Sequence, residues 1–146
     1  IELVTEQNNV IFDGLNLLGS LTFTESKTVK DTAFRAAEGK YLPQIPKLRG
    51  TAVATYRPAW LDEGKVAFTL AARYSDRTFG TIDNSDPVSQ TYQGFAGYLV
   101  ADARVHYQWD DNWSIAAGVD NLNNEKYFLF HPFPQRTFVL EVHYAQ

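Results

Sequence analysis

Connections of alternating length are the feature that most constrains how this chain can fold. Seven stretches are predicted as β-strands, at 1–7, 14–24, 49–57, 65–76, 97–108, 112–120 and 136–144. Most of them alternate apolar and polar residues with a two-residue period, but the alternation is weaker in the third stretch and the first is ambiguous. The segments between them are short and long in turn, at 8–13, 25–48, 58–64, 77–96, 109–111 and 121–135. An antiparallel meander with these connections has every long loop at one end and every tight turn at the other. A soluble sandwich has less reason to sort its loops by length.

The alternation predicts a sheet with one apolar and one mixed face. In the fourth stretch the apolar positions are Val66, Phe68, Leu70, Ala72 and Tyr74. The opposite face carries charged or ionisable residues in mid-strand, namely Arg73, Asp102, Arg104, Glu141 and His143. A soluble sandwich would expose this face to bulk water, whereas a large barrel would turn it toward a water-filled or plugged interior. Periodicity fits both arrangements.

Strand length and aromatic placement favour a membrane barrel. Several stretches run 9–12 residues, against a usual 5–6 in globular proteins, and a tilted strand needs about 9–11 to cross a bilayer. One set of aromatic residues flanks the short turns: Tyr56, Trp60, Tyr107, Trp109, Trp113 and Tyr144. Another lies toward the long loops: Tyr74, Phe79, Tyr98, Tyr127, Phe128, Phe130 and Phe133. Two such belts are typical of outer-membrane barrels, although edge aromatics can also pack a soluble core.

The bulk composition limits the possible partners and compartments. The 146 residues fit one domain, and a net charge of −4 argues against a nucleic-acid partner. The chain has no cysteine, hence no disulfide framework and no thiolate metal site. It also has no methionine, even at position 1, so we expect it to be part of a longer protein. Its apolar runs are too short for a membrane helix but not for membrane strands.

Several motifs follow one another in an order that resembles the barrel end of TonB-dependent outer-membrane receptors. Near the carboxyl end these are Gly118-Val119-Asp120-Asn121-Leu122, Glu125-Lys126-Tyr127, Pro134-Gln135-Arg136-Thr137-Phe138 and Glu141-Val142-His143-Tyr144. Upstream are Leu42-Pro43, Ile45-Pro46-Lys47, and Asp13-Gly14-Leu15 followed by Gly19-Ser20-Leu21-Thr22-Phe23-Thr24. Two features depart from the family pattern. Asn123-Asn124 stands where Phe-Asp is usual, and the chain ends in Ala145-Gln146 rather than an aromatic residue.

The resemblance implies an all-β, up-and-down antiparallel meander of seven strands, which is an incomplete segment of a barrel of about 22 strands. Residues 1–146 would be its C-terminal portion, without the plug domain, the earlier strands and the TonB contact. The short turns would be periplasmic and the long loops extracellular. The implied function is active uptake of a scarce nutrient across the bacterial outer membrane, most often a ferric siderophore or another metal chelate. We expect no enzymatic activity, cofactor or bound metal, and we expect the isolated piece to oligomerise or swap strands.

The same resemblance directs attention to two groups of residues. Extracellular-loop ligand contacts are expected at Phe79, Asp83, Asn84, Asp86, Tyr127, His131 and Phe133. Residues expected to face the lumen and plug are Arg73, Asp102, Arg104, Glu141 and His143.

Simpler structural roles compete with ligand binding in both loops. The segment His131-Pro132-Phe133-Pro134 can instead be a rigid loop that folds back over the rim. Asp83 to Asp86 is oxygen-rich, but turn formation explains it better, because the spacing lacks the glycine and distal glutamate of a calcium loop. His106 and His143 fall on the polar face of nonadjacent strands, where hydrogen bonding to a plug is expected rather than metal ligation.

The alternative function is a soluble antiparallel β-sandwich or lipocalin-like ligand-binding module without a membrane role. An enzymatic function has little support, since no Ser/His/Asp arrangement, glycine-rich phosphate loop or pair of catalytic carboxylates stands out. Asp102 and Arg104 share a face of one strand, which is more typical of an ion-pair network than of acid–base catalysis.

Overall fold

The computed structural model describes residues 1–86 and 88–146 and places the long strands in one antiparallel sheet. The strands are β1 (Glu2–Gln7), β2 (Leu15–Phe23), β3 (Leu48–Tyr56), β4 (Val66–Ser75), β5 (Tyr98–Gln108), β6 (Trp113–Asp120) and β9 (Thr137–Tyr144). They pair in sequence order, β1-β2-β3-β4-β5-β6-β9. Each predicted strand is confirmed to within one residue at either end.

Short elements lie in the connections. The 3₁₀ turns are η1 (Arg35–Ala37) and η2 (Asp62–Gly64), and the last long loop contains the paired β7 (Phe128–Leu129) and β8 (His131–Pro132). The pattern of the sequence did not predict this small hairpin. No helix among the described residues is long and apolar enough to cross a membrane.

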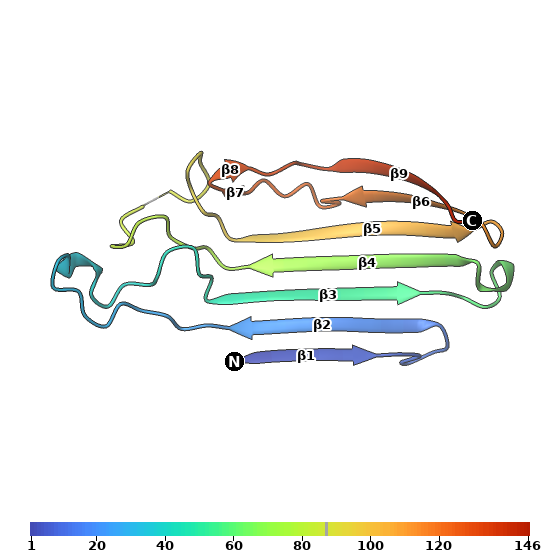
Figure 1. The fold of residues 1–146 in the computed structure, drawn as a ribbon, viewed down its shortest axis with the longest axis horizontal. Coiled ribbons are helices and arrows are strands. Elements are labelled where there is room, and N and C mark those ends of the chain that lie inside the picture. The colour runs from blue at the N-terminus through green and yellow to red at the C-terminus, as the bar shows by residue number, and fades with distance from the viewer. Residues whose placement is uncertain (87) are drawn as a thin grey trace.

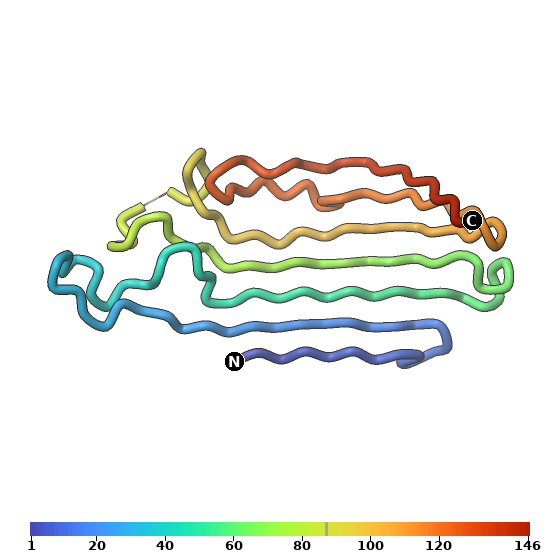
Figure 2. The backbone as a smooth tube through the Cα atoms, in the orientation of Figure 1, coloured from blue at the N-terminus to red at the C-terminus, as the bar shows by residue number. Residues whose placement is uncertain are grey.

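The sheet is a single layer with its connections sorted by length (Figure 1). The three long loops, which we call the first (24–47), second (76–97) and third (121–136), extend from one end of the strands. The tight turns lie at the other end, where the chain also terminates, as the backbone trace shows (Figure 2). The predicted segregation of long and short connections is therefore confirmed.

The pairing register assembles one continuous apolar face. Residues directly opposite one another in paired strands point to the same side of a sheet. One such row runs across six strands through Leu17, Ala54, Leu70, Ala103, Val119 and Phe138. Leu70 is 59% exposed and Phe138 is 77% exposed, so large apolar side chains on this face lie open. We call this side, which carries Leu70, the apolar face.

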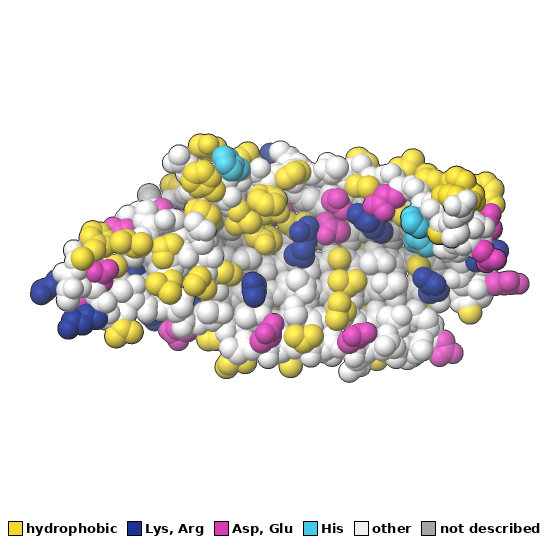
Figure 3. Space-filling view, in the orientation of Figure 1, with side chains coloured by type: hydrophobic (Ala, Val, Ile, Leu, Met, Phe, Trp, Pro, Cys, Tyr) yellow, Lys and Arg dark blue, Asp and Glu magenta, His cyan; other side chains and the backbone are white. Residues whose placement is uncertain are grey.

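The opposite side, which carries Arg73 and Asp102 and which we call the polar face, collects the hydroxyl and charged groups. Ser20 and Thr51 share a hydrogen bond of 2.8 Å between their hydroxyls, and Thr55 and Thr69 share one of 3.2 Å. Figure 3 views the sheet from this side and shows basic and acidic side chains next to one another over the strands. The predicted division into two chemically different faces is confirmed.

Aromatic residues form a belt on the apolar face at the short-turn end. Tyr56, Tyr107, Trp113 and Tyr144 belong to that face by register, and the Trp113 and Tyr144 rings lie 4.7 Å apart. The second predicted belt is partly wrong. Tyr98 points to the polar face, opposite Ser75, and the ring of Tyr127 packs 4.4 Å from that of Tyr98. The third loop folds inward over the sheet, so these two rings pack with each other instead of facing outward.

A soluble sandwich would need a second sheet to cover the apolar face. The described residues form one seven-stranded sheet and the small β7–β8 hairpin. Their main buried cluster is Ala96, Val100 and Tyr127, at the loop end of the polar side. The structure therefore gives the soluble alternative no support.

Two adjacent alanines in mid-strand β4 test the assignment of the faces. Ala72 lies on the apolar face between Ala52 and Ala101, whereas Ala71 lies on the polar face opposite Asp102. In a barrel embedded in lipid, Ala72→Arg should lower the free energy of unfolding by about 2–4 kcal/mol, because it places a charge in hydrocarbon. Ala71→Arg should cost much less. The measurement is reversible denaturant unfolding in bilayers, and an equal or larger cost for Ala71→Arg would contradict the assignment.

Candidate functional site

A hollow of about 410 Å³ lies at the loop end of the polar face, where all three long loops approach the sheet. Its floor is made by strand residues, among them Arg49, Thr51, Arg73 and Ser75. Its sides come from the loops, with Gln44 and Pro46 from the first, Thr78 and Phe95 from the second and Leu129 from the third. Side chains from the strands and from all three loops therefore line the same hollow.

Two arginines, Arg49 and Arg73, line this hollow together with one acidic residue, Glu2. Arg73 pairs with Asp102 on the neighbouring strand, with 3.2 Å between Nη2 and Oδ2. Arg49 projects from the adjacent strand β3 on the same face and is exposed. Among the described residues, no acidic group lies within 4.0 Å of Arg49. A guanidinium with no acidic partner in an open hollow can bind carboxylate, phenolate or hydroxamate oxygens of a ligand.

A second ion-pair network lies farther down the polar face. Arg104 is 3.0 Å from Glu141 and 3.8 Å from Asp120, measured between side-chain N and O atoms. Gly118 leaves room for this side chain, because a Cβ there would lie 2.7 Å from the Cγ of Arg104. The sequence predicted an ion-pair network at Asp102 and Arg104, and both residues form ion pairs. Asp102 pairs with Arg73 on β4, and Arg104 pairs with residues of β6 and β9. Each of these ion pairs links separate strands.

The two predicted polar-face histidines share a smaller hollow of about 300 Å³ near the short turns. His106 and His143 line it together with Ser114, Ala116 and Glu141. In the part of the chain that the structure describes, no group of three His, Cys, Asp or Glu residues is placed to hold a metal ion. The groups available here are hydrogen-bonding and charged side chains on a wet surface.

The base of the third loop is fastened by Asn121, which is 4% exposed. Its Nδ2 donates to the carbonyls of Glu125 and Pro134 at 2.8 and 3.2 Å, and its Oδ1 accepts from the Glu125 N–H at 2.7 Å. The backbone of Asn121 is left-handed, with φ 54°, which asparagine tolerates better than most residues. One side chain therefore joins both ends of the loop.

Tyr127, one of the predicted ligand contacts, serves as packing at this base. It is 5% exposed and stacks on Phe133, whose ring lies 4.8 Å away. Burial raises the pKa of the Tyr127 phenol, and the Arg73 guanidinium offsets part of that rise. We therefore assign Tyr127 to support of the third loop above the Arg73–Asp102 pair.

His131 and Phe133 remain exposed on the third loop. His131 lies 5.3 Å from Tyr92 and 5.0 Å from Phe130 between ring centroids, and Phe130 lies 6.3 Å from Phe95. These rings form an aromatic cluster that extends from the buried Phe95, at the hollow, to the exposed Tyr92, Phe130 and His131 on the loop surface. Aromatic and imidazole rings are suited to stack on a planar ligand.

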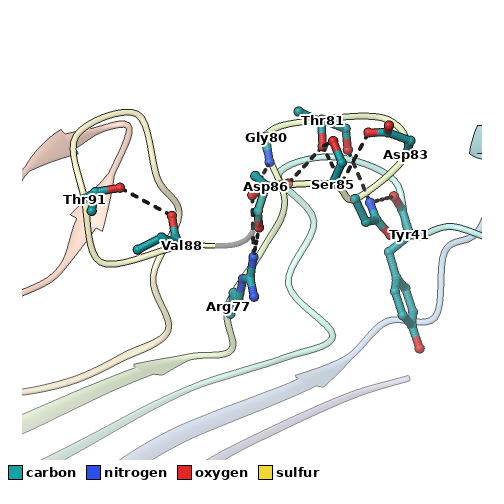
Figure 4. A network of polar contacts seen from close by, with 10 residues as sticks. Tyr41, Arg77, Gly80, Thr81, Asp83, Ser85, Asp86, Val88 and Thr91 are labelled. Atoms are coloured by element: carbon teal, nitrogen blue, oxygen red, sulfur yellow. Dashed lines mark hydrogen bonds and ion pairs between the residues drawn. The ribbon is translucent and has the colours of Figure 1, made fainter.

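The Asp83–Asp86 segment uses its oxygens within the turn, as Figure 4 shows. Asp86 accepts from the Gly80 N–H at 3.2 Å and from the Thr81 hydroxyl at 2.9 Å, and Arg77 Nη2 donates to its carbonyl. Asp83 accepts from the Ser85 N–H at 3.2 Å. Burial opposes the charged form of the Asp86 carboxyl, but the hydrogen bonds that it accepts from Gly80 and Thr81 outweigh burial and lower its pKa. This is the turn-forming role that the sequence analysis weighed against cation binding.

Asn84 and Phe79 also make contacts within the loops. Asn84 bonds to the backbone of Tyr41 in the first loop, and the Phe79 ring stacks on that of Tyr41 with 6.5 Å between centroids. Both residues therefore bridge two loops.

Sequence reasoning missed several residues of the site. Arg49, Gln44 and Phe95 could not be assigned to one hollow without the strand register and the loop paths. Asn123 was noted only as a departure from a motif. Its side chain accepts from the Ala101 N–H at 3.0 Å and donates to the Leu99 carbonyl at 2.7 Å. It thereby covers the edge of β5 beyond the end of β6, and its amide chemistry was the available signal.

The single antiparallel sheet and its two chemically different faces have the form of a segment of a membrane β-barrel, and the comparisons with known proteins agree. Residues 1–122 match the family model described as TonB dependent receptor-like, beta-barrel. The chain belongs to the TonB-dependent receptor β-barrel family, whose members are outer-membrane transport receptors rather than enzymes.

A curated relative is the ferric-pyoverdine M114 receptor PbuA of Pseudomonas sp. (strain M114), which is 26% identical over 132 residues. That alignment covers 84% of this chain and 14% of the relative. The chain therefore spans only a small part of the length of this receptor.

Solved structures of receptors and transporters share the fold. The receptor PiuA from Acinetobacter baumannii gives a TM-score of 0.76 at 22% identity, over 98% of this chain and 21% of that one. The unliganded ferric citrate transporter FecA gives 0.78 at 20% identity, over 91% and 21%. The ferric enterobactin receptor PfeA from Pseudomonas aeruginosa, as its G324V mutant, gives 0.72 at 18% identity, over 98% and 21%.

Proposed function

We propose that residues 1–146 supply the C-terminal strands and the last long loops of a receptor that imports a metal chelate across the outer membrane. The chelate that we propose is a ferric siderophore or a similar ferric chelate. The observation that carries this proposal is the open, arginine-containing hollow beneath the loops of a family barrel. The relatives are named as receptors or transporters of ferric pyoverdine, ferric citrate and ferric enterobactin. A ferric chelate is what these ligands have in common.

In such a receptor the two faces have different roles, one toward lipid and one toward the lumen. The apolar face and its aromatic belt contact lipid, which leaves the polar face toward the lumen. Arg73, Asp102, Arg104, Glu141 and His143 would then meet the plug domain, which other parts of the protein supply together with the TonB contact. The alternation of charge along this face suits a plug surface that is itself polar.

Ligand capture would begin at the loops and reach the hollow. His131 and Phe133 offer exposed rings, and Arg49 offers a guanidinium with no acidic partner among the described residues. Ferric chelates present negatively charged or carbonyl oxygens around the metal, and arginine binds such groups with paired donors. Phe79, Asp83, Asn84, Asp86 and Tyr127 contribute by holding the loops that carry these groups.

Uptake of ferric chelates in iron-depleted cells tests this function. Cells that depend on the complete receptor are given radioactive iron as ferric pyoverdine, ferric enterobactin or ferric citrate. We expect uptake of one of these chelates, and we expect Arg49→Gln to weaken its binding about tenfold or more through a lost charged hydrogen bond. Arg57→Gln, in a short turn at the opposite end, serves as the control and should leave binding unchanged. Failure to take up any ferric chelate would refute the proposal.

The exposed apolar face and the two outer strands also bear on the isolated chain. β1 and β9 each have one edge without a partner strand among the described residues, and such edges pair with other chains. We propose that the separate 146-residue chain oligomerises in buffer and binds a hydrophobic dye, and that detergent suppresses both effects. Analytical ultracentrifugation with and without detergent measures this. A dye-silent monomer in buffer would contradict the account of the apolar face.

A further inference from the structure

The first and second long loops are joined at Asn84, whose side chain makes the hydrogen bonds between them, and through the backbone beside it. Asn84 accepts from the Tyr41 backbone N–H at 2.8 Å and donates to the Tyr41 carbonyl at 2.9 Å, so its amide pairs with Tyr41 as a neighbouring strand would. Figure 4 shows Tyr41 of the first loop beside the turn of the second loop that carries Asp83 and Ser85. Nearby, the Gln44 N–H donates to the Phe79 carbonyl at 2.9 Å.

The second and third loops are joined mainly through their backbones. The Ala96 and Gln93 N–H groups donate to the carbonyls of Phe128 and Phe130 at 2.8 and 2.7 Å. The Phe130 N–H donates to the Gly94 carbonyl at 2.8 Å, and Phe95 and Leu129 form a β-bridge. This junction is a short ladder covered by aromatic rings, and it does not depend on any single side chain.

The junction at Asn84 is different because it concentrates several bonds on one residue. Asn84 also donates to the Thr81 carbonyl at 3.2 Å, which holds the amide in place within its own turn. Its backbone lies in the left-handed region at φ 56°, where asparagine and glycine are favoured and other residues are strained. The position therefore requires both an unusual backbone and an amide side chain.

We propose that Asn84 is a positioning residue that locks the first long loop to the second before any ligand arrives. Because the backbone ladder already joins the second loop to the third, the three loops then form one wall. The inference rests on the proposed function, in which the hollow beneath these loops receives part of the chelate. Gln44, Phe95 and Leu129, from the three different loops, line that same hollow. If the loops are already ordered, ligand binding does not have to include the entropic cost of ordering them, and the affinity is higher.

Distances between spin labels in the complete receptor without ligand test this lock. Labels at Lys30→Cys and Gln90→Cys report the first junction, and labels at Gln90→Cys and Lys126→Cys report the second. This part of the protein has no cysteine of its own. We expect narrow distance distributions for both pairs. Asn84→Gly keeps the backbone conformation but removes the amide, and it should broaden the first distribution at least twofold while the second stays narrow.

Two further variants separate a lock from general loosening. Asn84→Asp keeps the acceptor for the Tyr41 N–H but loses the donor, so its distribution should be intermediate. Asn9→Gly removes an asparagine side chain that likewise has a left-handed backbone, φ 53°, and accepts from the Gly14 N–H at 3.0 Å, but lies in a short turn. It should change neither distance.

A broad first distribution in the unmodified receptor, or a narrow one in Asn84→Gly, would overturn the proposal. The distances need no ligand, so a failure of chelate uptake would count against the proposed function alone. Intact uptake with independent loops would count against the lock alone.

Discussion

The structure is governed by one constraint: lipid hydrocarbon offers no hydrogen-bonding partners to the backbone. Every backbone N–H and carbonyl that enters a bilayer must be paired inside the protein, which restricts spanning chains to helices and closed barrels. In a paired strand the side chains then alternate between lipid and interior. The rows through Leu70 and Ala72 on one side and through Arg73 and Asp102 on the other are the direct result. β1 and β9 are the outer strands, and each has one edge that no other strand among the described residues pairs.

This constraint explains what could be predicted from the sequence. Strand positions and faces follow from a period that each strand carries in its own residues, so Phe68, Val105 and Leu140 could be placed on one face without knowledge of any partner strand. The sorting of loops by length also follows from a count along the chain. The turn at Asp83 to Asp86 can also be recognised, because the turn preference of aspartate and asparagine is local.

The site was harder to predict because its residues meet only through long-range register and inward loop folding. Tyr98 and Tyr127 have the residue type and the sequence position expected of a membrane belt. The third loop nevertheless carries Tyr127 over the polar face and buries it against Tyr98. Arg49 shares the hollow with Phe95 and Leu129 only because β3 pairs beside β4 and the loops lean over both. Asparagine side-chain amides then supply hydrogen bonds where no neighbouring strand pairs with the backbone. Asn121 closes one loop, Asn123 covers the edge of β5, and Asn84 joins two loops.

The central claim is that the two faces of this sheet meet different solvents, and a label scan along β5 tests it most directly. Single spin labels at each position from 98 to 108 in the membrane-embedded receptor report collisions with oxygen, which partitions into lipid, and with a water-soluble nickel complex. We expect oxygen access to peak at Leu99, Ala101, Ala103 and Val105 and to fall at the positions between them. A scan without this two-residue period, or one with the opposite phase, would contradict the account.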